Sequence, residues 1–109
     1  MSRAVQVNAL ALLSLFAFPF IFFFPVTIGV SLWFTRDISR AYYPFAVELA
    51  RALSEGRLPL WTPYLQAGFP LVAEGQVAAF YPPQLLMVKL FAPQFAISYE
   101  MLVHLAFAA

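Results

Sequence analysis

The longest uncharged segment of the chain contains the sequence ALALLSLFAFPFIFFFPVTIGVSLW at residues 9–33. It lies within 32 residues that separate Arg3 from Arg36 without a charged side chain. A helix needs about 20 apolar residues to cross the bilayer hydrocarbon. The segment therefore predicts a membrane-spanning helix over about 9–34. Membrane helices tolerate prolines such as Pro19 and Pro25 when neighbouring groups satisfy the freed carbonyls.

A cleaved signal peptide is the alternative interpretation of this segment. Its apolar region would be about 7–15 residues long and would end in a small-x-small cleavage site. The run found here is longer, is rich in phenylalanine and lacks such a site before Arg36. The pattern therefore favours a retained span.

The composition favours a membrane protein as a whole. Hydrophobic residues make up 63% of the chain and charged residues 10%, whereas a soluble domain carries about 25% charged residues. The net charge of +1 provides no basic field for nucleic acid. Cysteine is absent, which excludes disulfides and thiolate metal sites. The predicted fold class is all-α, a polytopic membrane helix bundle.

The segment after the first span indicates an amphipathic helix over about 42–55. Tyr42, Phe45, Leu49 and Leu53 recur at steps of three and four residues, which is the helical spacing of one apolar face. Gly56 is placed to cap the C-terminal end of this helix.

A second span is predicted to begin at about residue 93 and to be incomplete at residue 109. Pro93 suits the first turn of a helix, and a short helix is expected over 84–91. The apolar run continues to the last residue. Residues 1–109 are therefore expected to be the N-terminal fragment of a longer membrane protein, with the loop 35–92 between the two spans and the remainder of the parent polypeptide as a partner.

The loop segment 58–83 has an unusual composition. It holds five prolines, two glycines and five aromatic residues, with one carboxylate and no cation. Proline fixes φ and lacks an N–H donor, so the segment cannot be one continuous helix. We expect an ordered loop that lies against a membrane or other helices, and loops of this kind often carry binding sites.

An aspartate after the first span, followed by Tyr-Tyr-Pro-Phe, Gly-x-Leu-Pro-Leu-Trp-x-Pro-Tyr, Gly-Phe-Pro-Leu and Phe-Tyr-Pro-Pro, resembles the start of bacterial YfhO-type membrane proteins. These proteins are grouped with the GT-C glycosyltransferases. The resemblance covers about residues 37–86, plus His104. The residues whose order and spacing carry it are Trp61, Pro63, Tyr64, Gly68, Pro70, Tyr81, Pro82 and Pro83.

The resemblance implies a GT-C-like enzyme with many helices in the bacterial inner membrane. Such an enzyme moves a sugar from a polyprenyl-phosphate carrier to an acceptor on the outer face. It implies a cytoplasmic N-terminus and an extracytoplasmic loop over 36–92. A count of positive charges points the other way, because most cations lie in the loop. They are Arg36, Arg40, Arg51, Arg57 and Lys89.

Asp37 is the leading catalytic candidate. The resemblance implies that this carboxylate acts as the base on the acceptor hydroxyl or helps to hold a divalent cation. A carboxylate at the membrane edge suits proton abstraction. The structural alternative is a juxtamembrane charge that pairs with Arg40 or caps a helix. No spacing of His, Cys and Asp gives a metal site by itself, so the metal requirement stays open.

The candidate substrate-binding residues lie in the loop. Trp61, Tyr64 and Tyr81 can line a sugar or prenyl site with aromatic faces, although an interfacial aromatic belt has the same composition. Glu74 can act as a metal ligand or as a second acid, and Gln76 can bind a sugar hydroxyl. The alternative for Glu74 is a solvated turn.

Two further functions remain open from the sequence. The first is a transporter or flippase for lipid-linked substrates, in which Glu100 and His104 would matter more than Asp37. These two residues lie four positions apart on one helix face, and ionisable groups inside a bilayer are expected to face the bundle interior or water. The second is a small membrane protein that binds a partner through its loop.

Overall fold

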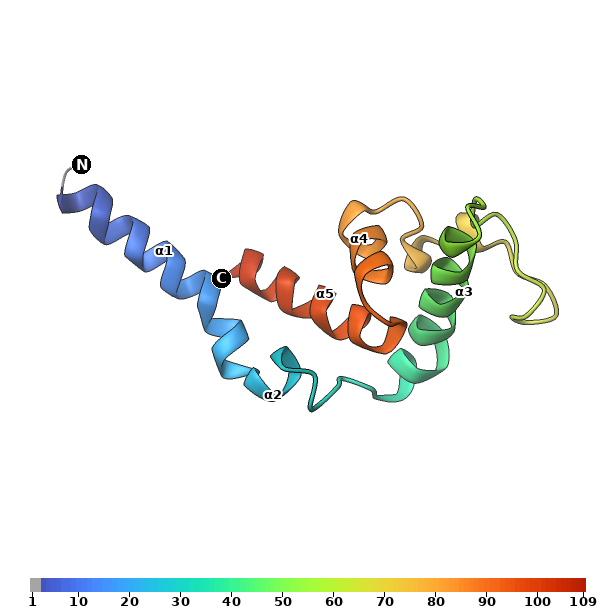
Figure 1. Ribbon diagram of the computed structural model, residues 1–109, viewed down its shortest axis with the longest axis horizontal. Helices are drawn as coiled ribbons and strands as arrows, with labels where there is room; N and C mark the ends of the chain where they lie inside the picture. The colour runs from blue at the N-terminus through green and yellow to red at the C-terminus, as the bar shows by residue number, and fades with distance from the viewer. Residues whose placement is uncertain (1–2) are drawn as a thin grey trace.

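The computed structural model describes residues 3–109, with side chains from Val5 onward, and its regular elements are helical (Figure 1). The α-helices are α1 (Arg3–Phe22), α2 (Phe24–Thr27), α3 (Tyr43–Ser54), α4 (Pro82–Leu90) and α5 (Pro93–Ala108). Three short helical turns lie between them, η1 (Ile38–Tyr42), η2 (Leu71–Ala73) and η3 (Gly75–Val77). The prediction of an all-α fold is confirmed.

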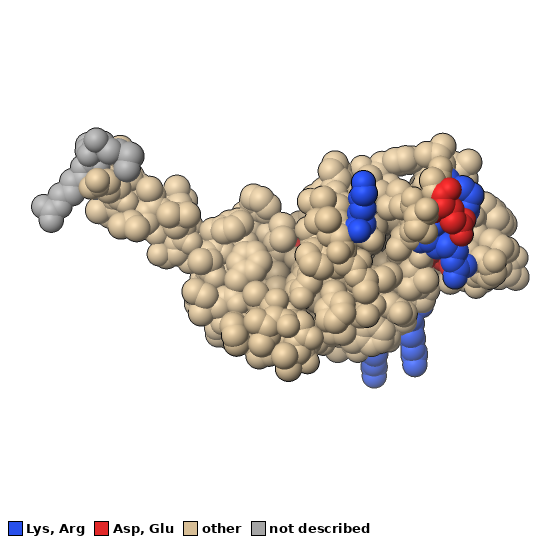
Figure 2. Space-filling view, viewed as in Figure 1, with Lys and Arg blue, Asp and Glu red and all other residues tan. Residues whose placement is uncertain are grey.

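Helix α1 is a long apolar arm at one end of an elongated molecule (Figure 1). The segment Val5–Phe22 has a mean hydropathy of 2.0, and only 6% of it is buried within the molecule. Among the described residues it is the one helix long and apolar enough to cross a membrane. A signal sequence near the N-terminus meets the same criteria. Between Val5 and Phe22 the visible face of α1 carries no charged side chain, and the charged groups drawn in colour gather over the other half of the molecule (Figure 2).

The helix ends earlier than the span predicted over 9–34. Helix α1 stops at Phe22, and Pro25 lies in the first turn of the separate helix α2. Proline has no N–H to continue the ladder of the preceding turn. Gly29 follows with a φ of 73°, a left-handed conformation that favours glycine. These two residues turn the chain back, so that the backbone N–H of Trp33 donates to Ser98 Oγ in α5 at 3.2 Å.

The buried core lies between α3, α4, α5 and the loop. Phe45 and Leu49 on α3 belong to one apolar cluster with Val77 from the loop, Val88 from α4 and Ile97 from α5. This is the apolar face that the helical spacing predicts for this segment. The amphipathic helix therefore holds the loop and the α4–α5 hairpin together.

The C-terminal end of α3 has the predicted glycine cap. Gly56 has a φ of 66°, and its N–H donates to the carbonyl of Leu53 at 3.1 Å. The N–H of Arg57 donates to the carbonyl of Ala52 at 2.8 Å. These two bonds are those of a Schellman motif, which satisfies carbonyls left free at the end of a helix.

The loop after α3 is ordered by one bridge within the loop and by two side-chain contacts with α3. Thr62 and Phe69 exchange backbone hydrogen bonds of 2.9 and 2.8 Å in an isolated antiparallel bridge. The Thr62 hydroxyl donates to the buried Glu48 carboxylate of α3 at 2.7 Å. The Phe69 ring stacks on Phe45 with a centroid distance of 5.4 Å. The loop is thus packed against α3, as its composition predicts.

Helices α4 and α5 form a hairpin, and α5 runs beside α1 (Figure 1). Helices α4 and α5 each begin at a proline. Proline is favoured there because the first N–H groups of a helix have no carbonyl partner within the helix. Near the far end of α5, the ring of Phe107 meets that of Phe16 in α1, edge to face, at 5.7 Å. The long helix is therefore joined to the rest of the molecule mainly through α5.

Candidate ligand pocket between α3, α4 and α5

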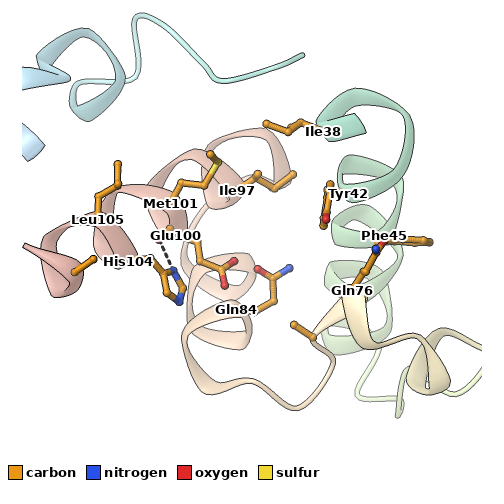
Figure 3. A pocket seen from close by; sticks show the side chains of 12 residues that line it. Ile38, Tyr42, Phe45, Gln76, Gln84, Ile97, Glu100, Met101, His104 and Leu105 are labelled. Atoms are coloured by element: carbon orange, nitrogen blue, oxygen red, sulfur yellow. Dashed lines mark hydrogen bonds between the residues drawn. The ribbon is translucent and has the colours of Figure 1, made fainter. Parts of the chain in front are cut away.

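An open pocket of about 640 Å³ lies between α3, α4 and α5 (Figure 3). Ligand sites for small molecules usually measure about 300–1,000 Å³. The residues that line the pocket are Ile38, Tyr42, Phe45, Gln76, Ala78, Gln84, Ile97, Glu100, Met101, His104, Leu105 and Ala108. Most of this lining is apolar, and its polar groups come from α4, α5 and the loop.

Glu100, His104 and Gln84 lie together on the side of the pocket formed by α4 and α5, whereas Gln76 lies across the pocket beside Phe45 (Figure 3). Glu100 and His104 occupy consecutive turns of α5, and Gln84 extends its amide from α4 towards the Glu100 carboxylate. Ile97 and Met101 supply apolar side chains from neighbouring positions of α5. The pocket therefore offers an apolar wall beside a cluster of hydrogen-bonding groups.

The imidazole of His104 is held at both nitrogens. Nδ1 lies 2.7 Å from the carbonyl oxygen of Glu100 (dashed line in Figure 3), and Nε2 lies 2.7 Å from the hydroxyl of Tyr81. Because a carbonyl only accepts, we assign the proton of the neutral ring to Nδ1. Nε2 then accepts from the Tyr81 hydroxyl. The ring is fixed, and it links the start of α4 to α5.

Gln84 is the most buried polar residue that lines the pocket. It lies on the buried face of α4 with Val88, and only 8% of its surface is exposed. Its amide makes no hydrogen bond with any described residue, and no side-chain polar atom in the described part of the chain is fully buried without a partner. The amide of Gln84 must therefore reach the open space of the pocket.

The Glu100 carboxylate also lacks a hydrogen-bond or ion-pair partner among the described residues. Only the backbone carbonyl of this residue is engaged, and it accepts from His104. The side-chain amide of Gln76 makes none either, since only its backbone N–H is engaged, by Glu74. With the Tyr42 hydroxyl, which also has no partner among the described residues, four polar side chains meet the pocket with unused hydrogen-bonding capacity.

Two of the predicted site residues belong to this pocket. Gln76 lines it, and Tyr81 borders it through the hydrogen bond to His104. Glu74 has a structural role, because its carboxylate accepts from the N–H of Gln76 at 3.1 Å and caps η3. Of the sequence candidates in the loop, the structure therefore brings Gln76 and Tyr81 together with the α5 pair.

Trp61 and Tyr64 lie outside the pocket, on the loop that packs against α3. They are 58% and 71% exposed. The guanidinium of Arg51 sits over the Tyr64 ring, 4.6 Å from its centroid. Trp61 covers Gly68 so closely that a Cβ added to this glycine would lie 2.6 Å from the indole ring. The two aromatic residues form a separate, exposed surface.

Asp37 also lies outside the pocket, one position before the lining residue Ile38. It is exposed, its side chain does not cap η1, and it makes no ion pair with Arg40 or any other described residue. The structure thus shows neither of the two structural roles considered for it. Within residues 3–109, no group of three or more His, Cys, Asp or Glu residues is placed to hold a metal ion.

Glu100 and His104 were singled out from the sequence, but Gln84 was not. The available signal was its position, because Gln84 lies four residues before the apolar Val88, on the same face of a helix. An uncharged polar residue on a buried helix face is costly unless something satisfies its amide. That pattern could have indicated a polar pocket at α4.

Comparisons with protein-family models, with curated proteins and with solved structures give no match to this chain. The family assignment stays a prediction from the sequence.

Proposed function

We propose that the chain is part of an integral membrane glycosyltransferase that uses a polyprenyl-phosphate-linked sugar on the outer face of the bacterial inner membrane. The observation that carries the proposal is the state of Asp37. This carboxylate follows the apolar N-terminal segment, is exposed, has no ion-pair partner among the described residues and lies beside a residue of the pocket. The sequence resemblance supports the same role.

In the proposed reaction, Asp37 takes the proton of the acceptor hydroxyl. The hydroxyl oxygen then forms a bond to the anomeric carbon of the sugar. The bond from this carbon to the phosphate oxygen breaks, and polyprenyl phosphate leaves with the electron pair. Base catalysis of this kind contributes about 10²–10⁴-fold to a rate. A divalent cation held in part by Asp37 is the other role that the resemblance implies.

The proposal includes a multi-pass topology. Helix α1 would cross the membrane from a cytoplasmic N-terminus, the loop 36–92 would lie outside, and α5 would begin a second span. The remainder of the parent polypeptide would complete the bundle and the catalytic cavity. The exposed, apolar surface of α1 supports this arrangement, because a large apolar surface is favourable in lipid and unfavourable in water.

Transfer can be measured in membrane vesicles that contain the complete protein. The probes are polyprenyl-phosphate-linked hexoses and pentoses, and the readout is release of polyprenyl phosphate. We expect Asp37→Asn to lower the rate by about 10²-fold or more, because the amide cannot accept the proton. Glu55→Gln is the matched control, since Glu55 is an exposed carboxylate paired locally with Arg57 at 2.5 Å. Full activity of Asp37→Asn at normal protein level would refute the proposal.

A transporter or flippase for lipid-linked substrates is the second candidate, favoured by the polar groups of α5 in an otherwise apolar pocket. In that case Glu100→Gln would abolish movement of a lipid-linked sugar across vesicle membranes, while Asp37→Asn would leave it unchanged. The two substitutions therefore separate the enzyme from the transporter.

A further inference from the structure

The unsatisfied amide of Gln84 suggests what the pocket binds. More than nine-tenths of this residue is buried, it lines the pocket, and its amide has no partner within the described part of the chain. The amide atoms are not fully enclosed, so they open onto the pocket, where a ligand can form hydrogen bonds with them in place of solvent. Gln84 is therefore a candidate ligand-binding residue.

The pocket presents both donors and acceptors. The amides of Gln84 and Gln76 each offer two N–H donors and one carbonyl acceptor, and the Glu100 carboxylate offers acceptors only. A hydroxyl group donates and accepts, so a cluster of hydroxyls can satisfy all three side chains. Ethers or ketones only accept, so they would leave the Glu100 carboxylate unmatched.

The charge of the pocket disfavours an anion. No Lys or Arg is among the residues that line it, and Glu100 is its one carboxylate. A phosphate beside this carboxylate would be repelled, and the repulsion is stronger in a partly desolvated site than in water. His104 is not available to bind an anion, because both of its ring nitrogens already bond with Tyr81 and with the Glu100 carbonyl. An uncharged ligand fits better than a phosphorylated one.

The remaining wall of the pocket selects for an apolar part of the same ligand. Ile97, Met101 and Leu105 present apolar side chains from α5, and Ile38 faces them from η1. A hydrocarbon chain or the apolar face of a ring can lie against this wall while hydroxyls reach Gln84. The ligand would then be amphiphilic.

We infer that the pocket between α3, α4 and α5 binds the uncharged, hydroxyl-rich head of an amphiphile, with Gln84 as its main hydrogen-bonding residue. This rests on the proposed function to the extent that it assigns the pocket to a hydroxyl-bearing acceptor and excludes the phosphate of the donor. The binding itself requires no transfer activity, so it can be tested separately.

The test uses the protein in phosphatidylcholine nanodiscs and an alkyl β-glucoside that carries a diazirine in its chain. Photocrosslinked peptides are mapped by mass spectrometry, and octyl β-glucoside or octyl phosphate is added as a competitor. We expect crosslinks within residues 97–105, competition by octyl β-glucoside, and at least about tenfold weaker competition by octyl phosphate. Equal competition by the two, or crosslinks confined to α1 through simple partition into lipid, would overturn the inference.

Substitutions at the pocket sharpen the test. Gln84→Leu keeps the size of the side chain and removes its hydrogen bonds, so we expect at least about tenfold weaker glucoside binding. Gln94→Leu, on α5 and outside the pocket, is the matched control and should leave binding unchanged. Unchanged binding by Gln84→Leu would refute the role of Gln84.

Glu100→Gln provides a second variant in case Gln84→Leu does not fold. It keeps the shape and removes the charge. We expect clearly stronger competition by octyl phosphate than in the original protein. If phosphate stays excluded from Glu100→Gln, the electrostatic argument fails. If glucoside binds as expected while Asp37→Asn retains transfer, the proposed function fails and the pocket assignment stands.

Discussion

At the scale of single residues, the buried carboxylate of Glu48 is the clearest polar requirement of the fold. It is 8% exposed, accepts from the Thr62 hydroxyl at 2.7 Å and pairs with Arg51 at 3.1 Å. A buried charge is tolerated when it is paired and hydrogen-bonded. Thr62 is therefore more than a spacer in a proline-rich loop, because it connects the loop to α3.

Thr62→Val tests this connection. Valine has nearly the shape of threonine but cannot donate to Glu48, so we expect the free energy of unfolding to fall by about 1–3 kcal/mol. Chemical unfolding in detergent, followed by circular dichroism, measures it. Thr62→Ser retains the hydroxyl and should stay closer to the original stability. Equal stability of the two variants would show that the bond to Glu48 contributes nothing.

At the scale of elements, the hydrogen bond from Tyr81 to His104 joins the first residue before α4 to α5. It spans 23 positions and closes the polar side of the pocket. The two rings are also stacked, with centroids 5.6 Å apart. The α4–α5 hairpin therefore depends on a polar contact at its open end as well as on apolar packing.

Tyr81→Phe should weaken the hairpin. The substitution removes one hydrogen bond and preserves the ring, so we expect a loss of about 1 kcal/mol in unfolding free energy. Hydrogen exchange of the α5 amides, measured by mass spectrometry, should be faster in this variant. Tyr99→Phe changes the same residue type on α5, where the hydroxyl makes no hydrogen bond with a described residue, and should have little effect. Identical exchange in both variants would contradict the prediction.

The helices differ in how well the sequence predicts them. Periodicity places the amphipathic helix at about 42–55, and α3 covers Tyr43–Ser54. Pro93 marks the start of α5, because proline is favoured in the first turn. The end of α1 at Phe22 was harder to predict, since hydropathy stays high to residue 34 and does not show a change of chain direction. Pro25 lies directly after the break, and Gly29 adds a second change of direction after α2.

The sequence predicted only part of the candidate site, because burial in the folded protein is not visible in hydropathy or charge. Ionisable residues inside apolar segments are conspicuous, and this signal indicated Glu100 and His104. Gln84 carries no charge and its importance depends on burial, which arises when α4 packs against α3 and α5. Trp61 and Tyr64 were grouped with Tyr81 by composition, but the fold directs them to a different surface.

At the scale of the whole molecule, the proposed topology places the loop outside and α1 across the membrane. The chain contains no cysteine, so single cysteines can report position without background. We expect Ser54→Cys, at an exposed site on the loop side, to react with a membrane-impermeant maleimide added outside intact cells. Ser14→Cys in α1 should stay unlabelled in lipid. Labelling of Ser54→Cys only after the membrane is permeabilised would show that the loop lies inside the cell, which contradicts the proposed topology.

The position of α1 also has a consequence for biosynthesis. Its neighbour within this chain is α5, and 70 residues lie between the last residue of α1, Phe22, and the first of α5, Pro93. At about 5–20 residues per second, the ribosome needs roughly 4–14 s to make that stretch. In the proposed topology, α1 must persist in the bilayer during this interval without its neighbour. Its internal hydrogen bonds and largely apolar surface would then have to suffice for insertion before any helix pairing begins.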